Sequence, residues 1–224
     1  AIHDAYYDLF LKSVRGQEMK AGLYSTSTPY QGYGNDAAPY SLSERNALIN
    51  GVTADGIHEI TTVSDALSEF KTDAGEFVQT WYEYLPDEVL NNTAPAGSVP
   101  LLLAIHGGGD DPRQYVDGQG WLRVAGQERI AMVAPEYSSM NNFAPDGRTA
   151  LNNAFPALVR YMLDKYPALD ASRVYVNGYS MGSLGTCEAM YGDPSIFAAA
   201  FPQAGIMNAA PTDEELKNFA DVNL

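Results

Sequence analysis

The pentapeptide Gly-Tyr-Ser-Met-Gly at residues 178–182 makes Ser180 a candidate nucleophile. It follows a β-branched and aromatic run at 173–177, which predicts a strand, and it precedes residues 183–191, which predict a helix. A strand, a sharp turn and a helix in this order lift a serine hydroxyl above the edge of a sheet, at a helix N-terminus. Such a serine still needs a base to become a nucleophile near neutral pH.

A second chemically distinctive segment is the His-Gly-Gly-Gly-Asp loop at 106–110, directly after the continuous apolar run 99–105. That run is typical of a strand buried on both faces. Successive glycines let backbone N–H groups come close to a ligand oxygen without side chains in the way. Because the carboxyl ends of parallel strands meet at one edge of a sheet, we expect this loop beside the candidate nucleophile. The backbone N–H groups of Gly107 or Gly108, together with that of Met181, then form an oxyanion hole.

The remaining elements must bring these two segments together. Strands and helices alternate from residue 99 onward, which predicts a mostly parallel sheet with helices on both faces. We expect residues 1–73 to form an N-terminal extension packed on a core domain of residues 74–224. Further strands are predicted at 57–63, 77–85, 130–134 and 197–203, and helices at 4–19, 121–129 and 149–165.

Composition narrows the function classes. A net charge of −15 argues against nucleic acid and anionic membrane surfaces as partners, because like charges repel. The single cysteine, Cys187, excludes an internal disulfide framework and a cysteine-rich metal site. No apolar run approaches the roughly 18 residues of a membrane span, and no signal peptide is visible. We expect neither a metal nor a cofactor.

Taken together, the motifs resemble the α/β-hydrolase superfamily over Phe77 to Gly205, a little over half of the chain. Within it, the sequence is most similar to secreted polyhydroxybutyrate-depolymerase-like and feruloyl-esterase-like serine esterases. The segments that carry the resemblance are Pro100 to Gly109, Gly120-Trp121 through Glu136, Val174 to Gly182 and Phe197 to Gly205.

The resemblance implies an α/β-hydrolase fold and cleavage of a carboxylic ester, small or polymer-linked, through an acyl-enzyme on Ser180. It implies backbone oxyanion donors at Gly107 or Gly108 and at Met181, and it implies secretion. The candidates to line the site are His106, Glu136, Tyr137 and Tyr179, and the side chains of the last three could equally belong to the core or to the rim. Of these, His106 in this motif usually braces the oxyanion loop.

The superfamily order of the triad is serine, acid, histidine, but no histidine follows Ser180. We expect that this chain is part of a longer or nicked polypeptide, in which a C-terminal segment supplies an aspartate and a histidine and covers the edge of the strand at 197–203. The alternative is a complete, inactive chain. His106 is a weak candidate for the base, and His3 and His58 precede the sheet.

Two other functions stay open. One is a serine peptidase of the prolyl-oligopeptidase type, which shares the fold and the elbow, although residues before 76 are too few for its usual propeller domain. The other is a non-catalytic protein that binds plant-wall glycans through tyrosines of the 24–40 segment, which is rich in Ser, Thr, Pro and Gly.

Overall fold

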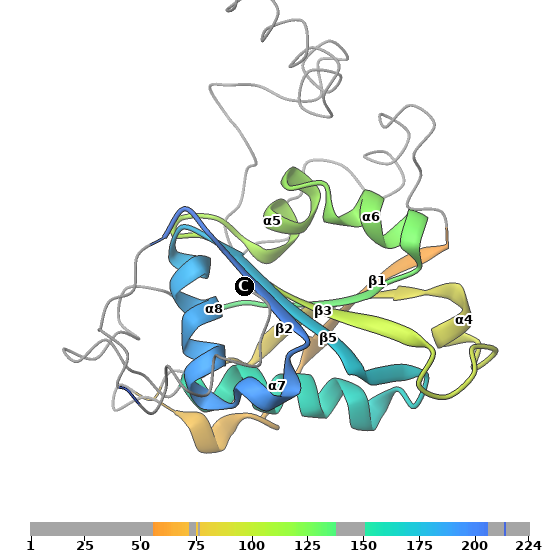
Figure 1. Ribbon diagram of the computed structural model, residues 1–224, viewed down its shortest axis with the longest axis horizontal. Helices are drawn as coiled ribbons and strands as arrows, with labels where there is room; N and C mark the ends of the chain where they lie inside the picture. The colour runs from red at the N-terminus through yellow and green to blue at the C-terminus, as the bar shows by residue number, and fades with distance from the viewer. Residues whose placement is uncertain (1–55, 72–74, 76, 138–150, 206–212, 214–224) are drawn as a thin grey trace, which may run out of the picture.

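Residues 56–71, 75, 77–137, 151–205 and 213 are described by the computed structural model. They form one mixed sheet of six strands in the spatial order β1-β2-β4-β3-β5-β6, drawn in Figure 1. The strands are β1 (Ile57–Val63), β2 (Thr80–Pro86), β3 (Val99–Ile105), β4 (Ala131–Pro135), β5 (Leu169–Tyr179) and β6 (Ala199–Gln203).

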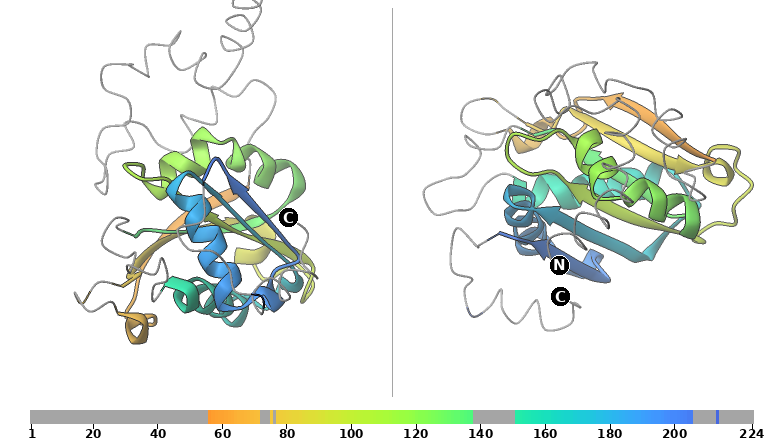
Figure 2. Two further views of the ribbon diagram at one scale, coloured as in Figure 1. Left: turned by 60° about the vertical axis from the view of Figure 1, so that its left-hand side comes forward. Right: turned by 90° about the horizontal axis from the view of Figure 1, so that it is seen from above.

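The last four strands in this order, from β4 to β6, run parallel, whereas β1 and β2 are antiparallel to their neighbours. Figure 2 (right) shows β1 and β6 at opposite edges of the sheet. The continuous apolar run predicted for β3 has the bounds that the sequence indicated. The strand expected from residue 77 begins only at Thr80, and the elbow strand β5 is longer than predicted.

Alternate residues of β3 face two separate hydrophobic layers. Leu101, Leu103 and Ile105 belong to the layer under the helices α7 and α8. Leu102 and Ala104 belong to the layer under α5 and α6. Figure 1 shows α5 and α6 above the sheet and α7 below it. A strand covered on both faces can be apolar at every position, which explains why β3 reads as a continuous run.

The helices are α4 (Asp87–Leu90), α5 (Pro112–Gly118), α6 (Trp121–Glu128), α7 (Leu151–Lys165) and α8 (Met181–Gly192), with 3₁₀ turns at Ser68–Phe70 and Pro194–Ile196. Helix α5, which the sequence did not predict, begins with a capping aspartate and a proline at its first position. The Asp111 carboxylate accepts a hydrogen bond from the Gln114 amide at 2.9 Å.

A buried carboxylate joins the sheet to the end of α7. Glu83 of β2 is fully buried, and it accepts hydrogen bonds from four side chains. Burial alone raises the pKa of Glu83, but these donors outweigh it and hold the pKa below its usual value. The donors are Thr62 at 2.7 Å, Trp81 at 2.9 Å, Lys165 at 2.9 Å and Tyr166 at 2.6 Å.

The predicted helix at 4–19 and the tyrosine-rich 24–40 segment lie outside the described residues. The predicted strand at 57–63 is confirmed as β1, which pairs with β2 along its whole length. The division into residues 1–73 and 74–224 stays a prediction. Within the described ranges, no helix combines the length and the apolar character that crossing a membrane requires.

Candidate active site

Ser180 occupies the turn between β5 and α8, as the pentapeptide predicted. Its backbone angles are φ 54° and ψ −115°, a region that non-glycine residues rarely adopt and that costs about 1–3 kcal/mol. The Ser180 amide donates to the Gln203 carbonyl at 2.8 Å, and the Ser180 carbonyl accepts from the Ser183 amide at 3.0 Å. These bonds hold the turn from both sides, and Ser180 remains exposed. Backbone strain at an exposed serine between strand and helix is the geometry of a nucleophile elbow.

The two glycines of the pentapeptide are required by close backbone approach. A Cβ on Gly178 would lie 1.9 Å from the Gly182 carbonyl oxygen. A Cβ on Gly182 would lie 2.0 Å from the Ile105 carbonyl oxygen. The first contact lets the chain reverse tightly around Ser180, and the second lets α8 sit against the end of β3. The motif spacing therefore encodes both the turn and the docking of α8 on the sheet.

The structure brings the glycine loop against this elbow. A Cβ on Gly107 would stand 3.2 Å from the Tyr179 carbonyl oxygen and 3.7 Å from the Ser180 Cβ. A Cβ on Gly108 would stand 3.6 Å from the Met181 sulfur. The predicted nucleophile and the residues predicted to supply the oxyanion donors thus lie close together, with room for little more than one methyl group between Gly107 and the elbow.

His106 lies beneath the loop, 5% exposed. Its Nδ1 lies 2.8 Å from the Gly107 carbonyl oxygen, and because a carbonyl only accepts, Nδ1 carries the proton of this bond. Burial lowers the pKa of His106, so the ring is neutral near pH 7. The ring therefore supports the loop from inside the protein.

The other three side chains expected to line the site differ in exposure. Tyr179 is 43% exposed and adjoins Gly107. Glu136 is half-buried, and burial followed by the nearby Asp111 raises the pKa of its carboxyl. Tyr137 points inward: it is 6% exposed, and its hydroxyl donates to the His106 carbonyl at 3.0 Å.

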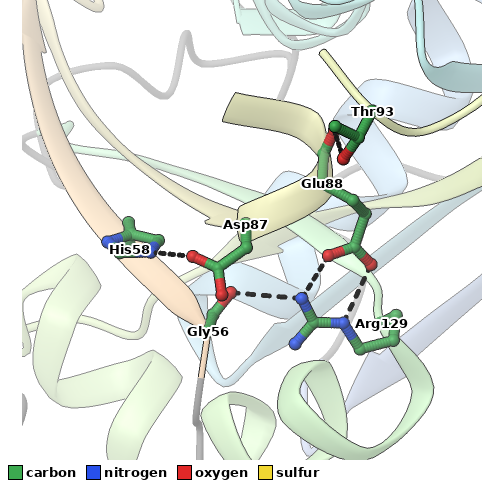
Figure 3. Close-up of polar contacts among 6 residues, drawn as sticks. All are labelled: Gly56, His58, Asp87, Glu88, Thr93 and Arg129. Carbon is green, nitrogen blue, oxygen red and sulfur yellow. Dashed lines mark hydrogen bonds and ion pairs between the residues drawn. The ribbon is translucent and has the colours of Figure 1, made fainter. Parts of the chain in front are cut away.

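His58 lies at the opposite end of the sheet. Its ring is hydrogen-bonded to the Asp87 carboxylate. Beside this pair, Arg129 forms an ion pair with Glu88 and donates a hydrogen bond to the Gly56 carbonyl, as Figure 3 shows. This cluster ties the start of β1 to α4 and to the end of α6. Among the described residues, neither His58 nor His106 hydrogen-bonds Ser180; His3 lies outside them.

The sequence did not single out two residues near the elbow, Asn177 and Tyr115, as part of the site. Asn177, three residues before Ser180, is buried and accepts a hydrogen bond from the Tyr115 hydroxyl of α5. Its amide nitrogen donates to the Phe201 carbonyl at 2.6 Å. A lone asparagine in an apolar strand was the available signal, but its partners are distant in sequence.

Known proteins are similar to this chain in sequence and in fold. A model of the prolyl oligopeptidase family matches residues 150–220. Poly(3-hydroxyalkanoate) depolymerase C of Paucimonas lemoignei is 28% identical over 168 residues, which cover 70% of this chain and 37% of that protein. Feruloyl esterase B of Thermothelomyces thermophilus is 28% identical over 135 residues, which cover 56% of this chain and 43% of that protein.

Among solved structures, a fluorophosphonate-binding serine hydrolase of Staphylococcus aureus matches with a TM-score of 0.52 and 19% identity, covering 67% of this chain and 58% of that one. The chain spans less than half the length of the two curated relatives. The expected fold class is confirmed: four parallel strands, two antiparallel ones and helices on both faces, with an elbow after β5. The chain is an α/β-hydrolase-fold protein, and the two curated relatives that it resembles are named a poly(3-hydroxyalkanoate) depolymerase and a feruloyl esterase.

Proposed function

We propose that the protein is a serine hydrolase that cleaves carboxylic esters through an acyl-enzyme on Ser180. The observation that carries this proposal is the strained, exposed Ser180 beside Gly107 of the glycine loop. The names of the curated relatives, a polyhydroxyalkanoate depolymerase and a feruloyl esterase, support an ester as the substrate, small or polymer-linked. Secretion stays a prediction.

In the proposed reaction, the Ser180 oxygen attacks the ester carbonyl carbon while a base takes the hydroxyl proton. The carbonyl oxygen becomes an oxyanion, which backbone N–H groups stabilise. When the carbon–oxygen bond to the leaving alcohol breaks, the alcohol takes the proton and the acyl group stays on Ser180. Water then attacks the acyl carbon while the base takes a proton from it. The bond from the acyl carbon to the Ser180 oxygen breaks, the base returns the proton to that oxygen, and the carboxylic acid leaves.

For Gly108, one of the two glycines proposed as oxyanion donors, hydrogen bonds fix the direction of the N–H group. The Gly107 carbonyl accepts from His106 Nδ1 and from the Asp110 amide at 3.3 Å. The peptide bond is trans, so the Gly108 N–H points away from that carbonyl and its two donors. His106 and Asp110 thereby fix the direction of the N–H group that follows. The Met181 N–H, at the start of α8, is the proposed second donor.

The base is proposed to be a histidine oriented by an aspartate, both from a polypeptide segment beyond the described residues. In support, neither described histidine hydrogen-bonds Ser180, and β6 is the edge strand of the described sheet, with Phe201 56% exposed. The relatives are also more than twice as long as the matched region. The histidine is expected within hydrogen-bond reach of the Ser180 oxygen.

Fluorophosphonate labelling of the full-length natural protein tests the nucleophile. The expected result is a covalent adduct on the peptide that contains Ser180, absent in Ser180→Ala. Ser183→Ala is the matched control, because Ser183 is buried in the first turn of α8 and should leave labelling intact. A folded, full-length protein that is not labelled contradicts the proposal.

A peptidase is the second candidate, because the matching family model is that of the prolyl oligopeptidases. Comparing kcat/KM for p-nitrophenyl acetate and for an aminoacyl-anilide separates the two activities. The ester is expected to turn over faster, and faster anilide cleavage would favour the peptidase. A panel of feruloyl, acetyl and hydroxybutyrate esters then identifies the acyl group.

A further inference from the structure

Three elements of the candidate site are linked by two consecutive hydrogen bonds, the first buried and the second partly buried. The Tyr115 hydroxyl of α5 donates to Asn177 Oδ1 in β5, and Asn177 Nδ2 donates to the Phe201 carbonyl of β6. The side chains of Tyr115 and Asn177 are each 1% exposed. Because the Phe201 carbonyl can only accept, the amide nitrogen must face it, and the amide oxygen is left for the tyrosine. The orientation of all three groups is therefore determined.

Each of the three elements carries one part of the candidate site. Helix α5 follows the glycine loop directly, and the loop ends at its capping residue Asp111. Strand β5 ends at Tyr179, directly before Ser180, which follows Asn177 by three residues. Strand β6 supplies the Gln203 carbonyl that accepts from the Ser180 amide, two residues after Phe201. The chain of hydrogen bonds thus connects the oxyanion loop, the nucleophile and the strand that holds the nucleophile's backbone.

The hydrogen bonds from Tyr115 to Asn177 and from Asn177 to Phe201 constrain the position of α5 on β5 more specifically than apolar packing does. The surrounding layer consists of apolar side chains such as Leu102, Val116 and Leu122, whose contacts have no directional preference. A buried hydrogen bond is directional, and leaving either partner unpaired is costly. The link therefore fixes the position of α5 along β5. A displacement of about 1 Å in a catalytic group can cost up to about 100-fold in rate.

We propose that Tyr115 and Asn177 are positioning residues that set the distance between the oxyanion loop and Ser180. The proposal rests on the proposed ester hydrolysis for its kinetic consequence, but not for its structural one. Both residues are only 1% exposed, so the proposed role is to position the loop and the elbow and not to bind the substrate. A merely structural pair would lower stability when broken and would leave the chemistry of the folded protein unchanged.

The kinetic test compares Tyr115→Phe with Tyr166→Phe in the full-length protein. Each change deletes one hydroxyl and its hydrogen bond, and Tyr166 binds Glu83 just before the start of β5, at the opposite end of that strand from Ser180. For p-nitrophenyl acetate, Tyr115→Phe is expected to lower kcat roughly tenfold with KM within about twofold, because the loop is misplaced in the transition state. Tyr166→Phe is expected to change neither constant. Equal kcat in the two variants overturns the proposal.

A second variant, at Asn177, tests whether Tyr115 acts through its hydrogen bond to Asn177. Asn177→Leu removes the acceptor while conserving volume approximately, so Tyr115→Phe should have no further effect on kcat when combined with it. Independent, multiplicative effects of the two changes would show that the residues do not act through each other, and would overturn the proposal.

Hydrogen exchange measures the positioning without any turnover. Amides of the loop at 106–111 and of the elbow at 178–183 are expected to exchange several-fold faster in Tyr115→Phe than in the wild type, but not in Tyr166→Phe. If the protein is not labelled by fluorophosphonate and hydrolyses no ester, the proposed function fails while this measurement still decides the positioning. Unchanged exchange in Tyr115→Phe overturns the inference whether or not the protein is an esterase.

Discussion

Gly182 lies directly against Ile105: a Cβ on Gly182 would stand 2.0 Å from the Ile105 carbonyl oxygen. Helix α8 can approach the end of β3 this closely only because residue 182 has no side chain. The contact places the start of α8 beside the glycine loop that follows β3, so a single glycine sets the geometry of two site elements.

Gly182→Ala is therefore expected to be strongly destabilising, by about 3 kcal/mol or more, since backbone rather than a flexible side chain occupies the space. Gly108→Ala is the matched control, because its Cβ would meet Met181 at an ordinary 3.6 Å. Urea unfolding measures both. A stability of Gly182→Ala close to that of Gly108→Ala would contradict the packing described.

Strain at Ser180 predicts a stability difference between two inactive variants. The φ of 54° is tolerated by glycine and unfavourable for alanine. Ser180→Gly is expected to be more stable than Ser180→Ala by about 1 kcal/mol, although glycine also gains entropy in the unfolded chain. Thermal unfolding of the two proteins, neither of which can be acylated at residue 180, provides the comparison. Equal melting temperatures would argue that the turn is unstrained.

The buried Glu83 predicts a specific pH dependence of stability. Because its pKa is lower in the folded protein than in the unfolded chain, it stabilises the fold above the unfolded pKa of about 4.3, and this contribution is lost as the pH falls through the folded pKa. Glu83→Gln is expected to cost about 1.5–3 kcal/mol at pH 7, because the charged hydrogen bonds are lost while the partly exposed Lys165 is solvated by water. The cost should shrink at about pH 3.

Urea unfolding at the two pH values measures this difference. Glu69→Gln serves as the control, because Glu69 is an exposed acid and its replacement should change stability by no more than about 0.5 kcal/mol. A cost of Glu83→Gln that does not vary with pH would show that its charge is not what holds the four donors.

For Asn177→Asp we expect the opposite pH dependence of stability to that of Glu83. One carboxyl oxygen would face the Phe201 carbonyl, so the acid must keep its proton to donate there, and burial also raises its pKa. The folded protein then holds more protons than the unfolded chain above pH ~3.9, and stability falls as the pH rises. The variant should unfold more readily at pH 8 than at pH 5 relative to the wild type. Parallel curves would contradict the hydrogen bond to Phe201.

Much of this site could be predicted from the sequence because it is encoded locally. The apolar run of β3 reports burial on both faces, and the glycine spacing around Ser180 reports a turn in which side chains would clash. The parallel order of strands then places both segments at one edge. Each of these signals depends only on neighbouring residues and on general rules of sheet topology.

The tertiary structure alone decided which distant side chains meet. The sequence left open whether Tyr137 lines the site or belongs to the core, and in the structure its hydroxyl turns inward to the His106 carbonyl. Tyr115 and Asn177 lie 62 positions apart and are joined by one hydrogen bond. A buried polar group must find a partner wherever the fold provides one, and that choice depends on how α5 packs across β5, which no local pattern of residues specifies.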